Sequence, residues 1–194
     1  MGRSLKFDYD KALDRATGLF WKRGYAGTSL RALLQVMGIG EGSFYNTLKS
    51  KKQLYIECLD HYKNTVGRRR AEVLAAAPSA SVGLRELYRA LLDGLDDPRA
   101  PRACMISGSV SGDVLAEPDL KGCVSKYVAE ITEDLARRLA ADKEAGRLPA
   151  DFDPKLVAEI INTYTQGIYQ SALVHYDRPQ FERQIDAFLK GLGL

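Results

Sequence analysis

The chain is poor in the residues on which disulfide-stabilised and metal-dependent proteins rely. Its 194 residues include only two histidines and three cysteines. The cysteines, Cys58, Cys104 and Cys123, are odd in number and widely spaced, which argues against a disulfide framework and is typical of proteins in a reducing cytosol. We therefore expect a cytoplasmic protein whose thiols are free.

Long apolar segments and cofactor motifs are also missing. Charged residues or glycines interrupt every apolar run before it reaches the roughly 18 to 20 residues of a membrane-spanning helix. The N-terminal residues lack an apolar signal region, and Lys6 stands where a myristoylation motif requires serine or threonine. The sequence contains no Glu-x-x-His pair, no phosphate-binding glycine loop and no Cys-x-x-Cys. We expect no membrane contact, no cofactor and no metal site.

An all-helical enzyme is the main alternative from another functional class. Glu57 and His61 stand four residues apart beside Cys58, which would place a base next to a nucleophile. Such a trio is much more often an ion pair on a helix surface. The residues therefore favour a binding protein over an enzyme.

Positive charge is concentrated in the first third of the chain. Residues 1–63 contain eleven Lys and Arg against six Asp and Glu, a balance of +5, whereas the remaining residues have a balance of −2. A basic segment attached to a nearly neutral body suggests a polyanionic partner for that segment alone.

Nearly every periodic segment has helical spacing, and no segment combines period-two alternation with a tight hairpin turn. Helices are predicted over residues 8–23, 30–37, 41–49, 51–76, 82–95, 103–115, 119–145, 154–176 and 179–192. Gly108 and Gly112 each cost up to about 1 kcal/mol relative to alanine inside a helix, so residues 103–115 are expected to be irregular. The fold class is therefore all-α, which we divide into a domain of residues 1–50 and a helical bundle of residues 51–194.

Only Gly38, Ile39 and Gly40 separate the second and third predicted helices. Both helices are short, and the glycines let the chain reverse tightly, which is typical of a helix-turn-helix. The free face of the third helix carries small or hydrogen-bonding residues that suit close approach to base edges, and lysines follow it that would meet flanking phosphates. These residues are Gly42, Ser43, Asn46 and Thr47, then Lys49, Lys51 and Lys52. The alternative is a loop between two short core helices.

The segment resembles the DNA-binding domain of the tetracycline-repressor (TetR) family over about residues 8–60. The resemblance rests on Ala16-Thr17-Gly18-Leu19-Phe20, Gly24-Tyr25, Thr28-Ser29-Leu30, the run from Met37 to Tyr45, and Lys49-Ser50-Lys51 followed by Leu54. It implies double-stranded operator DNA as a partner, with Tyr45 and Lys51 on phosphates and Ser43, Asn46 and Thr47 facing bases. The candidate DNA-binding residues are Thr28, Ser29, Arg31, Gly42, Ser43, Tyr45, Asn46, Thr47, Lys49 and Lys51.

The sequence departs from the family pattern at Gly40 and in the run Asn46-Thr47-Leu48. Gly40 stands where the family usually has a capping serine, which costs a few tenths of a kcal/mol. Asn46-Thr47-Leu48 replaces a more usual pair of aromatic or histidine residues followed by phenylalanine. The operator sequence therefore does not follow from the resemblance.

The last two predicted helices resemble the family helices that form a four-helix interface in a homodimer. Their apolar content is high for a surface, and a two-fold dimer would place two recognition helices about 34–36 Å apart, one turn of duplex. The candidate interface residues are Ile161, Ile168, Ala172, Phe181, Ile185 and Phe188. The alternative is that both helices belong to the core of the monomer.

Arg102-Ala103-Cys104-Met105-Ile106 resembles a cysteine-containing motif near the ligand cavity in one branch of the family. Cys104 is therefore a candidate sensor of electrophiles, although a cysteine on an apolar helix face is more often a small buried hydrophobe. The candidates for contact with an unidentified small-molecule effector are Cys104, Met105, Tyr88, Tyr127 and Tyr164. Tyrosines in such positions more often belong to the core than to a ligand-binding site.

Together these patterns predict a homodimeric, ligand-responsive repressor that binds a palindromic operator. A repressor that responds to thiol modification at Cys104 is the alternative mechanism. An architectural DNA-binding protein without a ligand is less compatible with a bundle of about 130 residues, which exceeds what dimerisation demands.

Overall fold

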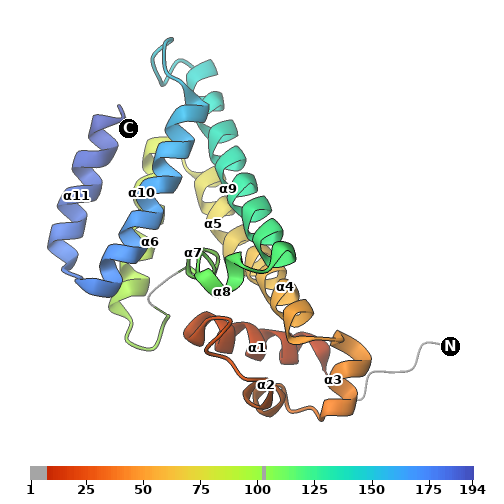
Figure 1. Cartoon of the computed structure of the whole chain (residues 1–194). Coiled ribbons are helices and arrows are strands. Elements are labelled where there is room, and N and C mark those ends of the chain that lie inside the picture. Colours follow the sequence, from red (N-terminus) through yellow and green to blue (C-terminus); the bar gives the residue numbers. More distant parts are fainter. Residues whose placement is uncertain (1–7, 102–103) are drawn as a thin grey trace. The chain divides into compact units, whose positions relative to one another are not determined.

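The structure is a computed structural model that describes residues 8–101 and 104–194 (Figure 1). All regular elements in these residues are helical, so the all-α prediction is confirmed. In chain order the helices are α1 (Tyr9–Arg23), α2 (Leu30–Met37), α3 (Glu41–Leu48), α4 (Lys51–Tyr62), η1 (Lys63–Gly67), α5 (Arg68–Ala76), α6 (Ala80–Asp96), α7 (Met105–Gly108), α8 (Gly112–Leu115), α9 (Pro118–Glu144), α10 (Pro154–Val174) and α11 (Arg178–Gly191).

Two predicted helices are interrupted. The helix predicted over 51–76 runs through α4, the π-helical segment η1 and α5. The helix predicted over 103–115 is reduced to the four-residue helices α7 and α8, and its first residue lies outside the described residues. The predicted irregularity at Gly108 and Gly112 is therefore confirmed, because α7 ends at the first glycine and α8 begins at the second.

Side-chain caps fix where most of the longer helices begin. In each, the oxygen of a serine or aspartate accepts a hydrogen bond from a backbone N–H of the first turn, which satisfies a donor that the helix itself leaves free. These caps are Asp8, Ser29, Ser50, Ser79, Asp153 and Asp177. Helix α3 follows Gly40 and has no side-chain cap, in agreement with the departure from the family pattern at this position.

The chain folds as two compact units. One comprises the residues up to Val66 together with Met105–Ser125, and the other comprises Gly67–Cys104 with Lys126–Leu194. This division differs from the boundary proposed after residue 50, because α4 and a distant segment belong to the first unit. That unit is built around the buried side chains of Phe20, Leu33, Phe44, Leu48 and Tyr55.

The turn between α1 and α2 leaves no room for a side chain at Gly27. A Cβ there would lie 2.3 Å from the carbonyl oxygen of Arg23. Gly27→Ala is therefore expected to destabilise the protein by about 1–3 kcal/mol, because the backbone of the turn must shift. Urea unfolding followed by circular dichroism measures the change. Gly18→Ala in helix α1 is the control: a Cβ there meets nothing within 4 Å, so this variant should gain about 0.5–1 kcal/mol.

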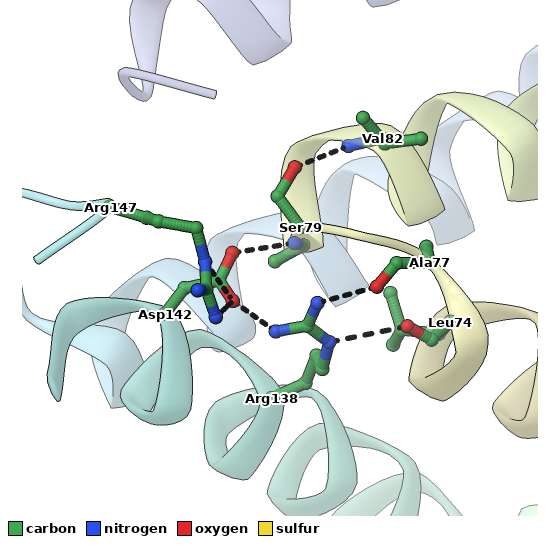
Figure 2. A network of polar contacts seen from close by, with 8 residues as sticks. Leu74, Ala77, Ser79, Val82, Arg138, Asp142 and Arg147 are labelled. Atoms are coloured by element: carbon green, nitrogen blue, oxygen red, sulfur yellow. Dashed lines mark hydrogen bonds and ion pairs between the residues drawn. The ribbon is translucent and has the colours of Figure 1, made fainter. Parts of the chain in front are cut away.

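The second unit is held by a buried carboxylate, Asp142 of α9, which is 1% exposed (Figure 2). It accepts hydrogen bonds from the backbone N–H of Ala80 (2.6 Å) and from the guanidinium groups of Arg138 and Arg147. Arg138 also donates to the carbonyl oxygens of Leu74 (3.2 Å) and Ala77 (3.0 Å). Two side chains of α9 thereby fix the neighbouring helices: Arg138 holds the end of α5, and Asp142 holds the start of α6.

Candidate nucleic-acid interface

The reversal between α2 and α3 has the geometry of a helix-turn-helix. Gly38 adopts the left-handed conformation (φ 70°, ψ 33°) that ends α2. Its N–H and that of Ile39 both donate to the carbonyl oxygen of Leu34, at 3.0 and 3.2 Å. Met37 and Phe44 are buried on either side of the turn. The predicted turn is thus confirmed, and burial of these residues directs the opposite face of α3 outward.

The outward face of α3 and its C-terminus presents Gly42, Tyr45, Asn46 and Lys49, all exposed. Their spacing of three, four and seven residues from Gly42 places them on one side of the helix. Ser43 and Thr47 are half-buried beside this face. Tyr45 is 51% exposed, and its ring meets that of the buried Phe44 edge-to-face with centres 5.3 Å apart. No carboxylate lies on this face beyond Glu41, so its charge is compatible with DNA.

The residues at the start of α2 are only partly available as the DNA contacts that the sequence predicts. Thr28 is fully buried and its hydroxyl donates to the carbonyl oxygen of Gly24 (2.7 Å). Its side chain stabilises the α1–α2 turn and is not available to DNA, which corrects its place among the candidate contacts. Ser29 is exposed but its hydroxyl caps α2 by accepting from the N–H of Ala32 (3.2 Å). Arg31 is exposed in the first turn of α2.

Lys49 connects α3 to α4 in a strained conformation. Its φ of 60° and ψ of −41° lie near the γ-turn, and the N–H of Ser50 donates to the carbonyl oxygen of Leu48 across it (2.6 Å). Among the described residues, Lys49 is the one non-glycine residue whose φ is positive. The turn lets Ser50 cap α4 directly after α3 ends, so the exposed Lys49 lies next to the start of α4.

The two lysines at the start of α4 have different surroundings. The Nζ of Lys51 lies 4.4 Å from the centre of the Tyr25 ring, a cation–π contact. Burial lowers the pKa of Lys51, against the attraction of Asp113. Lys52 forms ion pairs with Asp119 (2.7 Å) and Glu117 (3.6 Å). Its ammonium group is therefore engaged within the chain, which argues against the expected phosphate contact by Lys52.

The acidic partners of this region were missed in the sequence. Asp113, Glu117 and Asp119 lie more than sixty residues beyond the helix-turn-helix, and no local pattern connects them with it. The structure brings them to the first unit because α7, α8 and the start of α9 pack there. The sequence shows only that their charge is opposite to that of Lys51 and Lys52.

Two of the effector candidates contact each other. Tyr88 and Tyr164 come together in the second unit with ring centres 6.3 Å apart, and Tyr164 stacks on Phe188 at 3.7 Å. The hydroxyl of Tyr88 bonds to that of Thr165 (3.0 Å). The hydroxyl of Tyr164 is buried and has no hydrogen-bond partner among the described residues. Tyr127 is buried in the same unit.

Cys104 and Met105 fall in different units and are both buried. Cys104 is 8% exposed and raises the pKa of Tyr169, although burial is the larger cause of that rise. Cys58 is fully buried and its thiol pKa is raised to about 12 by burial, so it is unreactive at neutral pH. No group of three or more potential metal ligands occurs in the described part of the chain, and no helix there is long and apolar enough to span a membrane.

Most candidate dimer residues lie in the core of the single chain. Ile161, Ile168, Ala172, Phe181 and Ile185 are each at most 5% exposed, and Phe188 is half-buried against Tyr164. They fill the space between the helices of their own unit, so the monomer-core alternative describes them better. The exposed face of α10 is a different one, with the spacing 4-3-4-3-4. Its residues are Leu156, Ile160, Thr163, Gly167, Gln170 and Val174.

Two family descriptions match this chain. Residues 12–58 match "Bacterial regulatory proteins, tetR family", and residues 82–188 match "Tetracyclin repressor-like, C-terminal domain". The uncharacterised HTH-type transcriptional regulator YezE of Bacillus subtilis (strain 168) is 28% identical over 99% of this chain and 100% of its own length. The HTH-type transcriptional repressor ComR of Escherichia coli (strain K12) is 26% identical over 88% of this chain and 82% of its own.

A solved structure of similar fold includes DNA. It is a cysteine mutant of the TetR family transcriptional regulator CifR complexed with 26-base-pair double-strand operator DNA. It is 31% identical to this chain, covers 98% of both chains and superposes with a TM-score of 0.85. The fold described above is therefore one that also occurs in a protein bound to an operator.

Proposed function

Because the chain belongs to the TetR family of helix-turn-helix transcriptional regulators, we propose that it acts as a homodimeric repressor of a palindromic operator. A small molecule that binds its second unit releases the DNA. The family is one of DNA-binding regulators and not of enzymes, so the enzyme alternative is set aside. Because operator DNA is the target, we place this action in the cytoplasm. We assign DNA contact to the domain of residues 1–50 together with Lys51, which directly follows it, and effector binding and dimerisation to the helical domain of residues 51–194.

The exposed face of α3 carries the DNA-binding proposal. Gly42, which has no side chain, and Asn46, which carries an amide, lie on a helix held by buried residues on its other side. An asparagine reads adenine in the major groove through a bidentate hydrogen bond, and small neighbours allow the helix to approach. Tyr45 and Lys49 flank this reading surface and are suited to phosphate oxygens.

The exposed face of α10 supports the homodimer. Leu156 and Ile160 are 52% and 37% exposed, and Val174 is 90% exposed. Their heptad-like spacing is that of a helix seam that packs against a second helix. Thr163 and Gly167 between them are small enough for close approach. A second copy related by a two-fold axis would cover these apolar side chains with the same face.

Selection of bound duplexes from a random pool, near physiological salt, tests the proposal directly. We expect an enriched palindrome bound by two or four chains, the stoichiometry being read by native mass spectrometry. Enrichment of a single, non-repeated half-site bound by one chain would contradict the dimer, and no enrichment by folded protein would contradict specific binding by the apo form.

Substitutions on α3 and α4 should separate base reading from phosphate contact. Asn46→Ala combined with Thr47→Ala is expected to reduce discrimination against altered bases, by about 1–3 kcal/mol for each base that is no longer read. Tyr45→Phe and Lys51→Ala should instead weaken all duplexes alike, and Lys51→Ala should also reduce the salt dependence. Fluorescence anisotropy on the selected operator and on single-base variants distinguishes these results. Full affinity and selectivity in the double variant would remove both residues from base reading.

The partnerless hydroxyl of Tyr164 supports effector binding near α6, α10 and α11. A buried hydroxyl without a partner costs about 1–3 kcal/mol, and a ligand with a hydrogen-bond acceptor would remove this cost. Tyr164→Phe is expected to leave thermal stability unchanged or raised, while weakening any effector that uses the hydroxyl. Tyr88→Phe is the control, since it breaks the bond to Thr165 and should lower stability by about 1 kcal/mol. Differential scanning fluorimetry measures the thermal stability of both variants. A loss of stability in Tyr164→Phe would contradict the absence of a hydrogen bond at the Tyr164 hydroxyl.

Thiol modification at Cys104 is the alternative way of releasing DNA. Cys104 lies in the segment between α6 and α7, close to Tyr169. Treatment with N-ethylmaleimide should then weaken operator binding in the wild type but not in Cys104→Ser. Equal loss in both proteins would assign the effect to another thiol, and Cys123→Ser identifies whether the half-buried Cys123 is that one.

A further inference from the structure

The first unit contains a long-range contact to the turn that precedes α2. One carboxylate oxygen of Asp113, in α8, accepts a hydrogen bond from the backbone N–H of Ala26 at 2.9 Å. The two residues are 87 positions apart in the chain. Ala26 lies in the turn between α1 and α2, so a residue of a distant segment holds the backbone of the helix-turn-helix domain directly.

The carboxylate of Asp113 is itself held in place. The Ser111 hydroxyl and the backbone N–H groups of Ala26, Asp113 and Val114 donate to it. Together these donors outweigh burial and keep the pKa of Asp113 below its ordinary value. The side chain is therefore ionised at neutral pH and is fixed by its own helix, so it provides a rigid acceptor for Ala26.

A second buried contact fixes the same segment against α4. The hydroxyls of Tyr55 and Ser109 lie 2.7 Å apart in the core. Because Ser109 donates its proton to the carbonyl oxygen of Met105 (2.7 Å), Tyr55 is the donor in this pair. The ring of Tyr55 also packs against that of Tyr25, with centres 4.9 Å apart. Residues 105–113 thus contact both α4 and the α1–α2 turn.

The position of the α1–α2 turn determines where α2 and α3 lie. Ser29 caps α2 three residues after Ala26, and only two residues, Ile39 and Gly40, separate the end cap of α2 from the start of α3. A shift of the turn is therefore passed to the helix that faces DNA, and base contacts depend on placement to within about 1 Å.

We propose that Asp113 is a positioning residue for operator binding: its hydrogen bond to Ala26 holds the α1–α2 turn where α2 and α3 fit the major groove. The proposal rests on operator binding by the first unit. It assigns to α8 a role in DNA affinity although α8 itself supplies no contact to DNA.

The proposal predicts that removing the Asp113 carboxylate changes DNA affinity in the direction opposite to that expected from the loss of a negative charge alone. Removing a carboxylate from a DNA-binding unit strengthens binding if only electrostatics matters. Asp113→Ala should instead weaken binding of the selected operator about tenfold. Asp113→Asn loses the same charge but keeps an oxygen acceptor and should bind within about twofold of the wild type or more tightly. Asp113→Glu keeps the charge but displaces the carboxylate by one methylene and should also weaken binding.

Fluorescence anisotropy with full-length protein measures these affinities. Binding of the wild type to the same duplex is established first, so that failure of this proposal can be distinguished from failure of operator binding itself. Hydrogen exchange of a peptide covering residues 24–29 gives an independent readout: Ala26 should exchange faster in Asp113→Ala and Asp113→Glu than in Asp113→Asn. Equal or tighter operator binding by Asp113→Ala overturns the proposal, as does an equal loss in Asp113→Asn. If Asp113→Ala does not fold, the comparison of Asp113→Asn with Asp113→Glu decides.

Discussion

Asp142→Ala is expected to lower the free energy of unfolding by about 3–5 kcal/mol, a large fraction of the stability of a domain of this size. The substitution removes the acceptor of two buried donors, the guanidinium group of Arg138 and the backbone N–H of Ala80. The side chain of Arg138 is 14% exposed and that of Asp142 is 2% exposed, so water does not take over as the acceptor for these groups. Urea unfolding at fixed protein concentration, followed by circular dichroism, measures the change.

Asp134→Ala provides a matched control on the same helix. Asp134 also pairs with an arginine, Arg137, but its side chain is 54% exposed, so its removal should change stability by no more than about 0.5 kcal/mol. A similar small effect for Asp142→Ala would show that the network in Figure 2 contributes little to stability.

The same carboxylate should make the fold sensitive to acid. Burial alone would raise the pKa of Asp142, but hydrogen bonds from Arg147, Ala80 and Arg138 outweigh it and hold the pKa below 3.8. A carboxyl with a lowered pKa in the folded state stabilises above its unfolded pKa, and this contribution is lost as the pH falls through the folded value. Unfolding midpoints measured from pH 7 down to pH 3 should therefore fall less steeply in Asp142→Asn than in the wild type below about pH 4.

Ile160→Glu is expected to abolish the dimer and to weaken operator binding by about 100-fold or more. Ile160 lies on the exposed face of α10, and a two-fold dimer through this face would bury the introduced carboxylates in an apolar interface. A monomer binds one half-site and loses the gain in affinity that comes from two linked recognition helices. Analytical ultracentrifugation and anisotropy on the full palindrome measure the two effects.

Ile131→Glu is the control for this substitution. Ile131 of α9 is 41% exposed, close to the 37% of Ile160, so the two variants introduce the same charge at similarly exposed isoleucines. Ile131→Glu should remain a dimer with unchanged affinity. If Ile160→Glu also remains a dimer that binds DNA normally, the exposed face of α10 is not the interface between copies.

Local chemistry allowed the sequence to predict most helices within a few residues. Serine and aspartate caps such as Ser29 and Asp153 satisfy the free N–H groups of a helix from within a few residues, and Gly38 adopts the left-handed cap because it has no Cβ. The exposed face of α3 was predicted for the same reason: Phe44 and Leu48 fix by their spacing which side is buried. These features need no information from distant residues.

Tertiary packing decided which apolar and polar side chains are available to a partner. The sequence shows that α10 and α11 are apolar over a broad face, but periodicity does not distinguish a chain's own core from an interface. It therefore predicts Ile161 and Ile185 in the dimer interface, whereas the structure buries both in the monomer. Thr28 has the polarity of a DNA contact, yet its hydroxyl is used inside the turn.

The contacts of Asp113 with Ala26 and of Asp142 with Ala80 depend entirely on the fold. Each joins a side chain to a backbone N–H more than sixty residues away. A backbone donor has no signature in the amino-acid sequence, since every residue except proline carries one. Helix boundaries and the exposed face of α3 are therefore local properties of this chain, whereas the contacts that join distant segments within each unit arise only when those segments pack together.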